Sequence, residues 1–256
     1  MTVTDDNEAE PALPVVKADD DDAAAADDDA DAEAKAKARS SSIFSKLKSV
    51  YISVFIDVIG VGLVIPVLPY LILSFKGAGA SEVGWTIAVY SLCQIPGSLV
   101  FGFVSDKYGR RPVLLLSIFF SALSFLLCGL ATNLQFVIMA RAISGLTGGS
   151  ISVAQAYVAD VTTIEERPKY LGLIGATIGV AFTFGPGIGA ATAAIMESAG
   201  ASVQQQYSGV FFMASLFGFL GFVYAQRNLE EPSTDETRDG DGDSDEKALT
   251  KPGKEA

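Results

Sequence analysis

The stretch Gly-Phe-Val-Ser-Asp-Lys-Tyr-Gly-Arg-Arg, residues 102–111, is a short charged turn between two long apolar segments. Each flanking segment, 83–105 and 113–131, is long enough to cross a bilayer, because about 20 apolar residues span a hydrocarbon core about 30 Å thick. The segment from Val113 to Ala131 carries no charge, so it has no polar face recurring every helical turn for water to solvate. The turn and its flanks therefore predict a helical hairpin in a membrane.

Apolar stretches of this length recur through the middle of the chain, and a lipid bilayer is the partner that their composition requires. They occupy residues 49–75, 83–105, 113–131, 134–159, 170–194 and 207–226. We therefore predict an all-α integral membrane protein whose six-helix transmembrane domain covers residues 49–226. Acidic tails flank this domain at residues 1–48 and 227–256, and the second of them also resembles the start of a loop.

The formal net charge of -12 is concentrated in these two tails. Residues 1–48 hold 13 acidic and 6 basic side chains, and residues 227–256 hold 10 and 5. Segments rich in Asp and Ala bury too little apolar surface to offset the entropy of ordering, so both tails are predicted to be disordered. Their acidity then indicates solvation rather than a basic partner, and nothing in the composition indicates binding to nucleic acid.

Basic residues in the short flanks of the spans predict the orientation of the chain, because Lys and Arg favour the cytoplasmic side during insertion. With both termini inside, one set of flanks carries Lys46, Lys48, Lys107, Arg110, Arg111, Arg167, Lys169 and Arg227. The opposite loops carry only Lys76. The pattern predicts a multi-pass protein with cytoplasmic N- and C-termini and no cleavable signal peptide. The plasma membrane is the default location.

The loop at residues 102–111 contains more than the basic residues that orientation requires. Asp106 at the end of the second span and Gly102 one turn earlier need another explanation. Their order, followed by Gly109 and an arginine pair, resembles the cytoplasmic loop between helices 2 and 3 of major facilitator superfamily transporters. The resemblance implies a gating loop made of Gly102, Asp106, Gly109, Arg110 and Arg111, with Asp160 at the end of the fourth span as a candidate acidic partner.

Two ionisable residues, Asp57 and Arg141, lie well inside predicted spans. Burying such a group costs at least about 2.5–3.5 kcal/mol on insertion scales, so each is a candidate functional residue. Their opposite charges leave two interpretations open: a structural ion pair between the first and fourth spans, or a pair that works in transport. The axial positions of the two residues give no reason to assume that they touch.

The sequences around these two charges extend the resemblance. Asp57-Val-Ile-Gly-Val-Gly-Leu-Val-Ile-Pro-Val-Leu-Pro69 is similar to helix 1 of tetracycline-type drug:proton antiporters. Arg141-Ala-Ile-Ser-Gly145, followed by Gly148 and Gly149, resembles the helix 4 motif whose arginine is implicated in proton coupling. The resemblance implies that Asp57 and Arg141 take part in proton coupling. An arginine is permanently charged, so its expected task is either to lower the pKa of a nearby carboxylate or to respond to the protonation of that carboxylate.

The fifth predicted span contains closely spaced glycines and a proline. Glycines four residues apart allow helix backbones to approach closely in lipid, and a proline inside a helix removes one backbone donor and bends it. Residues 172–190 resemble the antiporter motif on helix 5, which implies roles for Gly175, Gly179, Gly185, Pro186 and Gly189. One departure is Ala190, where the motif usually ends in a second glycine.

The resembling family folds as two six-helix halves around a central cavity, and this chain corresponds to the N-terminal six-helix bundle. We expect a proton-coupled antiporter that exports small organic molecules, with a second half or a second copy as partner. Truncation is the favoured explanation of the half-length chain. The alternative is a non-transporting truncated membrane protein that associates with a full-length transporter. No nucleotide loop, metal-ligand cluster or nucleophile-base constellation indicates an enzyme, a cofactor or a metal.

Overall fold

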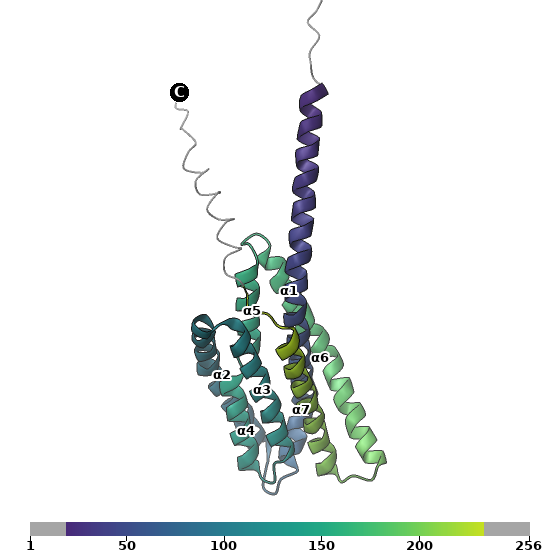
Figure 1. Ribbon diagram of the computed structural model, residues 1–256. Helices are drawn as coiled ribbons and strands as arrows, with labels where there is room; N and C mark the ends of the chain where they lie inside the picture. The colour runs from purple at the N-terminus through teal and green to yellow at the C-terminus, as the bar shows by residue number, and fades with distance from the viewer. Residues whose placement is uncertain (1–18, 233–256) are drawn as a thin grey trace, which may run out of the picture. The chain divides into compact units, whose positions relative to one another are not determined.

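A computed structural model describes residues 19–232 of the chain (Figure 1). These residues belong to two compact units, Met1–Ser42 and Ile43–Ala256, and the second unit holds every residue discussed below. The first helix, α1 (Asp19–Leu73), begins inside the segment predicted to be a disordered tail, in a stretch rich in alanine, the strongest helix former. The disorder predicted for residues 1–18 and 233–256 concerns residues outside the described part and stays a prediction.

The described part of the second unit is built from helices. After α1 come α2 (Ala80–Tyr108), α3 (Arg110–Gly129), α4 (Leu134–Thr147), α5 (Ser150–Val161), α6 (Arg167–Ser198) and α7 (Val203–Asn228). Six segments of residues 43–232 are long and apolar enough to cross a membrane. Each contains or overlaps one predicted stretch, so the prediction of six spans is confirmed. The observed helices run a few residues further at most ends because polar residues extend them beyond the apolar core.

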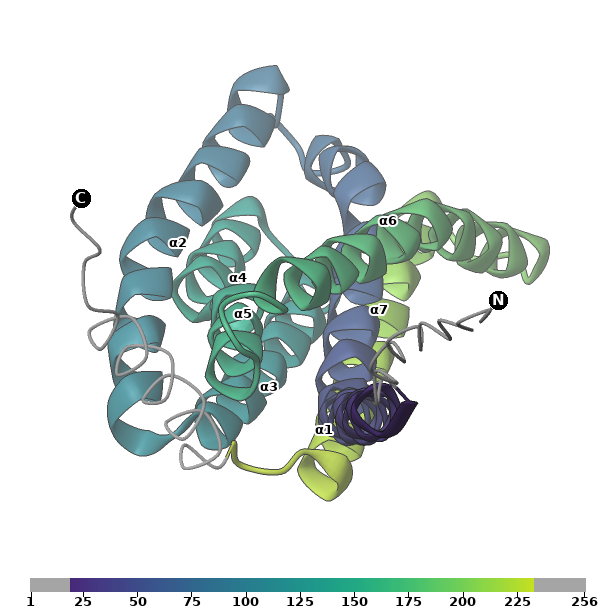
Figure 2. The same cartoon turned by 90° about the horizontal axis from the view of Figure 1, so that it is seen from above.

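The spans lie side by side along their lengths (Figure 1). Seen from above, α2, α3 and the α4–α5 pair lie on one side of the bundle, and α1, α6 and α7 lie on the other (Figure 2). Small residues set the closest contacts. A Cβ added at Gly218 of α7 would lie 2.7 Å from Cβ of Ala122 on α3, and Ser215 of α7 donates a hydrogen bond to the Ala122 carbonyl at 3.0 Å.

The fourth span, Leu134–Val161, is interrupted between α4 and α5. Gly148 and Gly149 form the break: α4 ends at Thr147 and α5 starts at Ser150. A Cβ at Gly149 would lie 2.7 Å from Cβ of Phe101 on α2, so this backbone passes directly over a neighbouring helix. The Thr147 carbonyl, which has no partner within α4, accepts hydrogen bonds from the Ser117 hydroxyl of α3 at 2.7 Å and from the Gly149 N–H at 2.8 Å, as the last carbonyls of a helix require.

Two of the spans are poorly covered by the rest of the bundle. Within the most apolar 18-residue window of each span, 11% of α2 and 17% of α6 is buried, against 44–61% for the other four. Pro186 lies inside α6, which continues as one helix across it. The faces of α2 and α6 therefore meet either lipid or another protein.

Candidate functional site

A cavity of about 490 Å³ opens between the helices of the bundle. Its polar lining includes Asp57 of α1, Arg141 of α4 and Ser150 of α5, and aromatic rings from three other helices complete the wall: Tyr90, Phe125 and Phe182. Aliphatic side chains of α1 cover the remaining apolar side. The lining thus combines a mainly apolar surface with a few converging polar groups, as small-molecule sites do. We call this space the central cavity.

Asp57 is 4% exposed. Its carboxyl group lies beside Ser150, the first residue of α5. Its Oδ2 accepts a hydrogen bond from the Ser150 hydroxyl at 2.7 Å, and Ser121 of α3 lies beside the same carboxyl group. The other oxygen, Oδ1, is buried and receives no hydrogen bond of good geometry. The first residue of α5 therefore holds one oxygen of the carboxyl group, while the other oxygen stays available to a further partner.

Ser150 was not predicted as a site residue from the sequence. A single serine in an apolar span is more often bonded to its own helix, as Thr147 is to the Ile143 carbonyl. The available signal was its position directly after Gly148 and Gly149, since a break in a helix places the next residue at a new N-terminus. Only the packing of α5 against α1 shows that its hydroxyl reaches Asp57.

The guanidinium of Arg141 is held between two aromatic rings. Its Cζ lies 5.8 Å from the ring centre of Phe125 on α3 and 5.7 Å from that of Phe211 on α7. The residue is 7% exposed, and its Nε and Nη2 atoms are buried without a hydrogen-bond acceptor. Cation–π contacts offset part of the cost of burying the charge. Two donor nitrogens of a permanently charged group therefore remain unpaired.

The structure brings Asp57 and Arg141 to the wall of one cavity without joining them. No ion pair links the two side chains among the described residues, so the interpretation as a structural ion pair finds no support here. Both groups keep unpaired polar atoms in a buried site, where an unmade hydrogen bond is costly. The arrangement can accept a proton at the carboxylate and a hydrogen-bond acceptor at the guanidinium.

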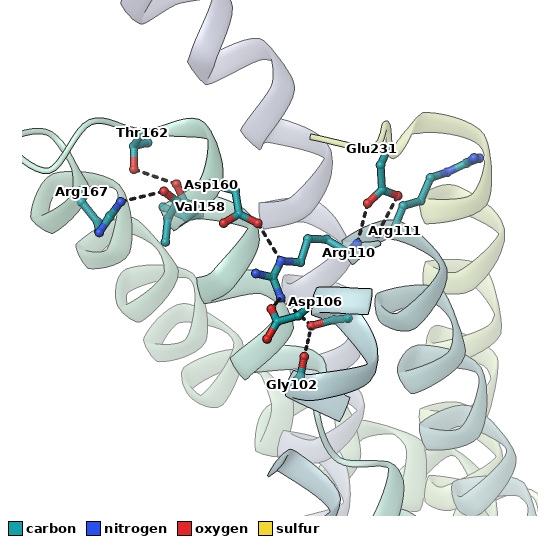
Figure 3. Close-up of polar contacts among 11 residues, drawn as sticks. Gly102, Asp106, Arg110, Arg111, Val158, Asp160, Thr162, Arg167 and Glu231 are labelled. Atoms are coloured by element: carbon teal, nitrogen blue, oxygen red, sulfur yellow. Dashed lines mark hydrogen bonds and ion pairs between the residues drawn. The ribbon is translucent and has the colours of Figure 1, made fainter. Parts of the chain in front are cut away.

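A second cluster of charges lies where α2 and α5 end and α3 begins (Figure 3). Arg110 bridges two carboxylates: Nη1 lies 2.5 Å from Oδ1 of Asp106, and Nε lies 2.7 Å from Oδ2 of Asp160. The guanidinium also donates to the Ser105 hydroxyl at 2.6 Å, which in turn donates to the Gly102 carbonyl at 2.8 Å. We call Asp106, Arg110 and Asp160 the loop network. The guanidinium is well satisfied, because Nη1 and Nε together have three acceptors.

The loop network contains three of the residues predicted from the sequence for the gating loop and its acidic partner. The side chain of Asp160 comes from α5, 50 positions from Arg110. Gly109 has φ 98°, a backbone conformation that side chains with a Cβ rarely adopt, and it separates α2 from α3. Gly102 contributes its carbonyl, and a Cβ there would meet nothing within 4 Å. Arg111 points away from the network and donates to the Gln226 carbonyl at 2.9 Å.

The glycines of α6 fall into two groups. Gly185 and Gly189 face α1, where an added Cβ would lie 2.8 Å from Cα of Gly62 and 3.2 Å from the Leu63 carbonyl oxygen respectively. Around Gly175 and Gly179, by contrast, an added Cβ would meet nothing within 4 Å. One part of the predicted motif therefore packs helices within this bundle, and the other part lies on its uncovered face.

Comparison with known sequences establishes what kind of protein carries this geometry. Residues 50–254 match the sequence profile described as Major Facilitator Superfamily. The chain belongs to the Major Facilitator Superfamily. Accordingly, it is a multi-pass integral membrane protein, and the six spans of its described part correspond to one six-helix half of the superfamily fold.

Individual superfamily members are similar over most of this chain. Tetracycline resistance protein, class B, of Escherichia coli is 33% identical over 76% of this chain and 46% of its own length. Multidrug resistance protein 1 of Bacillus subtilis is 30% identical over 70% and 44%. The human organic anion transporter MFSD10 (TETRAN) superposes with a TM-score of 0.61 at 22% identity, over 74% of this chain and 48% of that one. The chain thus spans less than half the length of each.

These names refer to transport and resistance rather than to catalysis. The alternative of a non-transporting truncated chain finds no support among them. At 22% identity the structural likeness to MFSD10 shows the fold alone.

Proposed function

We propose that this six-helix bundle works in a proton-coupled exchanger, with Asp57 as the proton-binding group and Arg141 as its charged neighbour. The observation that carries the proposal is that both residues line one cavity, are buried, and keep polar atoms without partners. Buried ionisable residues of a span mark ion and substrate pathways more often than structure. A carboxylate and a guanidinium that do not pair with each other are free to serve a proton and a substrate.

Exchange requires that a proton and the substrate compete for this site. An ionised Asp57 has one oxygen without a hydrogen-bond partner, and this oxygen can accept a hydrogen bond from a donor group of the substrate. When Asp57 takes up a proton it loses its negative charge and binds that donor less strongly, so the proton displaces the substrate. Binding of the substrate to the carboxylate lowers the affinity of Asp57 for a proton in turn. Proton and substrate therefore change each other's affinity in both directions, as linkage requires.

The cavity wall indicates the class of substrate. Tyr90, Phe125 and Phe182 offer aromatic surface, and Arg141 offers unpaired donors. This combination favours flat organic molecules with an anionic or strongly accepting group. Tetracycline fits that description, and the names of the relatives make it the first compound to try. The direction that we propose is export.

The loop network is our candidate for the gate. Arg110 ties the end of α2 to the end of α5 through its two carboxylate partners, so the ends of these helices stay together as long as the ion pairs are intact. We place this end of the bundle at the cytoplasmic side, because the basic residues of the spans collect there. Breaking the network would allow α2 and α5 to separate and the cavity to open on that side.

A second six-helix bundle is the partner that we propose for the uncovered faces of α2 and α6. These are the two least buried spans, and Gly175 and Gly179 leave α6 smooth on that face. A second copy of this chain or a separate second half would serve. Cysteines placed at Ala176 in a chain without Cys93 and Cys128 should cross-link in membranes if two copies meet there. A chain that stays monomeric in cross-linking and native electrophoresis would rule out the homodimer.

Neutralising Asp57 tests the proposed function. The full chain is reconstituted in liposomes with an imposed pH gradient, and tetracycline movement is followed for the native protein, for Asp57→Asn and for Glu197→Gln. Glu197 is an exposed acid near the end of α6, so its replacement controls for the loss of one charge. We expect Asp57→Asn to lower gradient-driven transport by about 100-fold, in the range of a lost proton-transfer group, and Glu197→Gln to leave it unchanged. Equal rates for the native chain and Asp57→Asn would refute the role of Asp57.

A further inference from the structure

The residues that follow the end of α7 at Asn228 remain in contact with the bundle. Leu229 is 2% exposed, packed in the core, and its N–H donates to the Ala225 carbonyl at 2.8 Å. The next residue, Glu230, accepts a hydrogen bond at its carbonyl from the Tyr157 hydroxyl of α5 at 2.9 Å. Three residues that follow the last span are thus fastened to the end of the bundle that holds the loop network. We call Leu229–Glu231 the exit segment.

The carboxylate of Glu231 closes the N-terminus of α3 (Figure 3). It accepts hydrogen bonds from the backbone N–H of Arg110 at 2.5 Å and of Arg111 at 3.1 Å. The first N–H groups of a helix have no acceptor within the helix, and the partial positive charge there favours a carboxylate. These bonds join positions 121 and 120 residues apart in the sequence, so they fix tertiary structure and not only a local turn.

Gly109 leaves the space that this contact requires. A Cβ at this position would lie 2.5 Å from Oε1 and 2.8 Å from Cδ of Glu231. The carboxylate therefore rests against the backbone of the α2–α3 loop at the point where φ is 98°. Glycine adopts this backbone conformation without strain, and Glu231 binds the two N–H groups that follow it, those of Arg110 and Arg111.

We infer that Glu231 is a positioning residue for the gate: it holds the backbone of Arg110 so that the guanidinium reaches both Asp106 and Asp160. The inference rests on the gating role proposed above for the loop network. Arg110 has one side chain to span two carboxylates on different helices, which is possible only while its backbone stays in place. The ion pairs of the gate therefore depend on the contacts that the exit segment makes after the sixth span.

Backbone hydrogen exchange tests the contact itself. It is measured on the purified full chain in nanodiscs, in the peptide that contains Arg110 and Arg111. The variants are Glu231→Ala, Glu231→Gln and Glu230→Ala. Loss of both charged acceptors should speed exchange of these two amides about tenfold, and glutamine, which keeps one acceptor, should give a smaller increase. Glu230 is the matched control, because it is the adjacent acid and uses only its carbonyl; we expect no change from it.

A double-mutant cycle tests whether Glu231 acts through Arg110 rather than as a simple helix cap. Thermal unfolding is followed for Glu231→Gln, Asp160→Asn and the double variant, and for the same cycle with Glu230→Gln. Residues in one network give non-additive effects, whereas independent residues give additive ones. We expect the double variant with Glu231→Gln to lose less than the sum of its single losses, and the Glu230 cycle to be additive.

These measurements use no substrate, so their outcome does not depend on whether the chain transports. Equal exchange rates in Glu231→Ala and Glu230→Ala would show that the cap is absent in solution and would overturn the inference. An additive cycle for Glu231 and Asp160 would leave Glu231 as a cap of α3 without a role in positioning Arg110. The proposed proton coupling at Asp57 would stand in either case.

Discussion

The molecule holds two groups of opposite charges, which differ in burial and in whether the charges form ion pairs. In the loop network Arg110 is 15% exposed and lies in contact with both Asp106 and Asp160. In the central cavity Asp57 and Arg141 are 4% and 7% exposed and form no ion pair with each other. Burial makes an unpaired charge far more costly than a paired one. The unpaired charges at the cavity are therefore the costlier arrangement. This contrast supports our proposal that the loop network holds helix ends together while the cavity binds the proton and the substrate.

Replacing Arg141 with lysine tests whether the central charge alone is enough. Lysine keeps the positive charge but loses the planar group that lies between Phe125 and Phe211 and its paired donors. We expect gradient-driven transport to fall about tenfold, with little loss of folded protein, as measured in liposomes. Arg227→Lys at the exposed end of α7 is the control. Full activity of Arg141→Lys would mean that the geometry of the guanidinium is irrelevant.

Removing one carboxylate from the loop network should have a smaller effect. Asp160→Asn leaves Arg110 with Asp106 and Ser105, and the lost pair is partly exposed, so it contributes about 1 kcal/mol or less. We expect transport to fall about threefold to fivefold, in line with that energy. Rates in liposomes and thermal unfolding in detergent give the two readings. A loss as large as that of Asp57→Asn would erase the difference between the two groups of charges.

The hydrogen bond from Ser150 to Asp57 should contribute less again. Ser150→Ala removes one hydroxyl donor to a carboxylate that keeps its place beside Ser121 and α5. A single hydrogen bond contributes about 0.5–1.5 kcal/mol. We expect the low end of that range, a fall in transport of about twofold, because Ser121 remains beside the carboxyl group. Ser152→Ala is matched to it, because Ser152 donates to the Gly149 carbonyl within its own helix. Similar losses in the two variants would mean that the Asp57 contact has no special part.

We expect the smallest effect from salt, which should change the melting temperature differently for variants in the two regions. Raising the ionic strength to about 1 M shortens the screening length to about 3 Å, which weakens exposed ion pairs and affects buried charges little. We expect the difference in melting temperature between the native chain and Asp160→Asn to shrink at high salt. The difference between the native chain and Arg141→Lys should stay constant. Equal salt dependence would indicate that water reaches both regions to the same extent.

The spans could be predicted from the sequence because lipid imposes length and composition on each helix separately. The partners of the charged residues could be predicted only in part, because they depend on how the helices pack. Asp160 was a natural candidate, since an acid at the end of the fourth span has few basic neighbours to meet. Glu231 carries no such mark: it stands in an acidic run, and only the packing of the exit segment distinguishes it from Glu230. Ser150 was missed for a similar reason, because its contact depends on how α5 crosses α1.

The break at Gly148 and Gly149 gives α5 a mechanical property. This helix of 12 residues has its first residue bonded to Asp57 and, ten positions later, Asp160 bonded to Arg110. At a rise of 1.5 Å per residue the two attachments are about 15 Å apart on one stiff rod. A tilt of this helix about its inner end would therefore displace the ion pairs at its outer end.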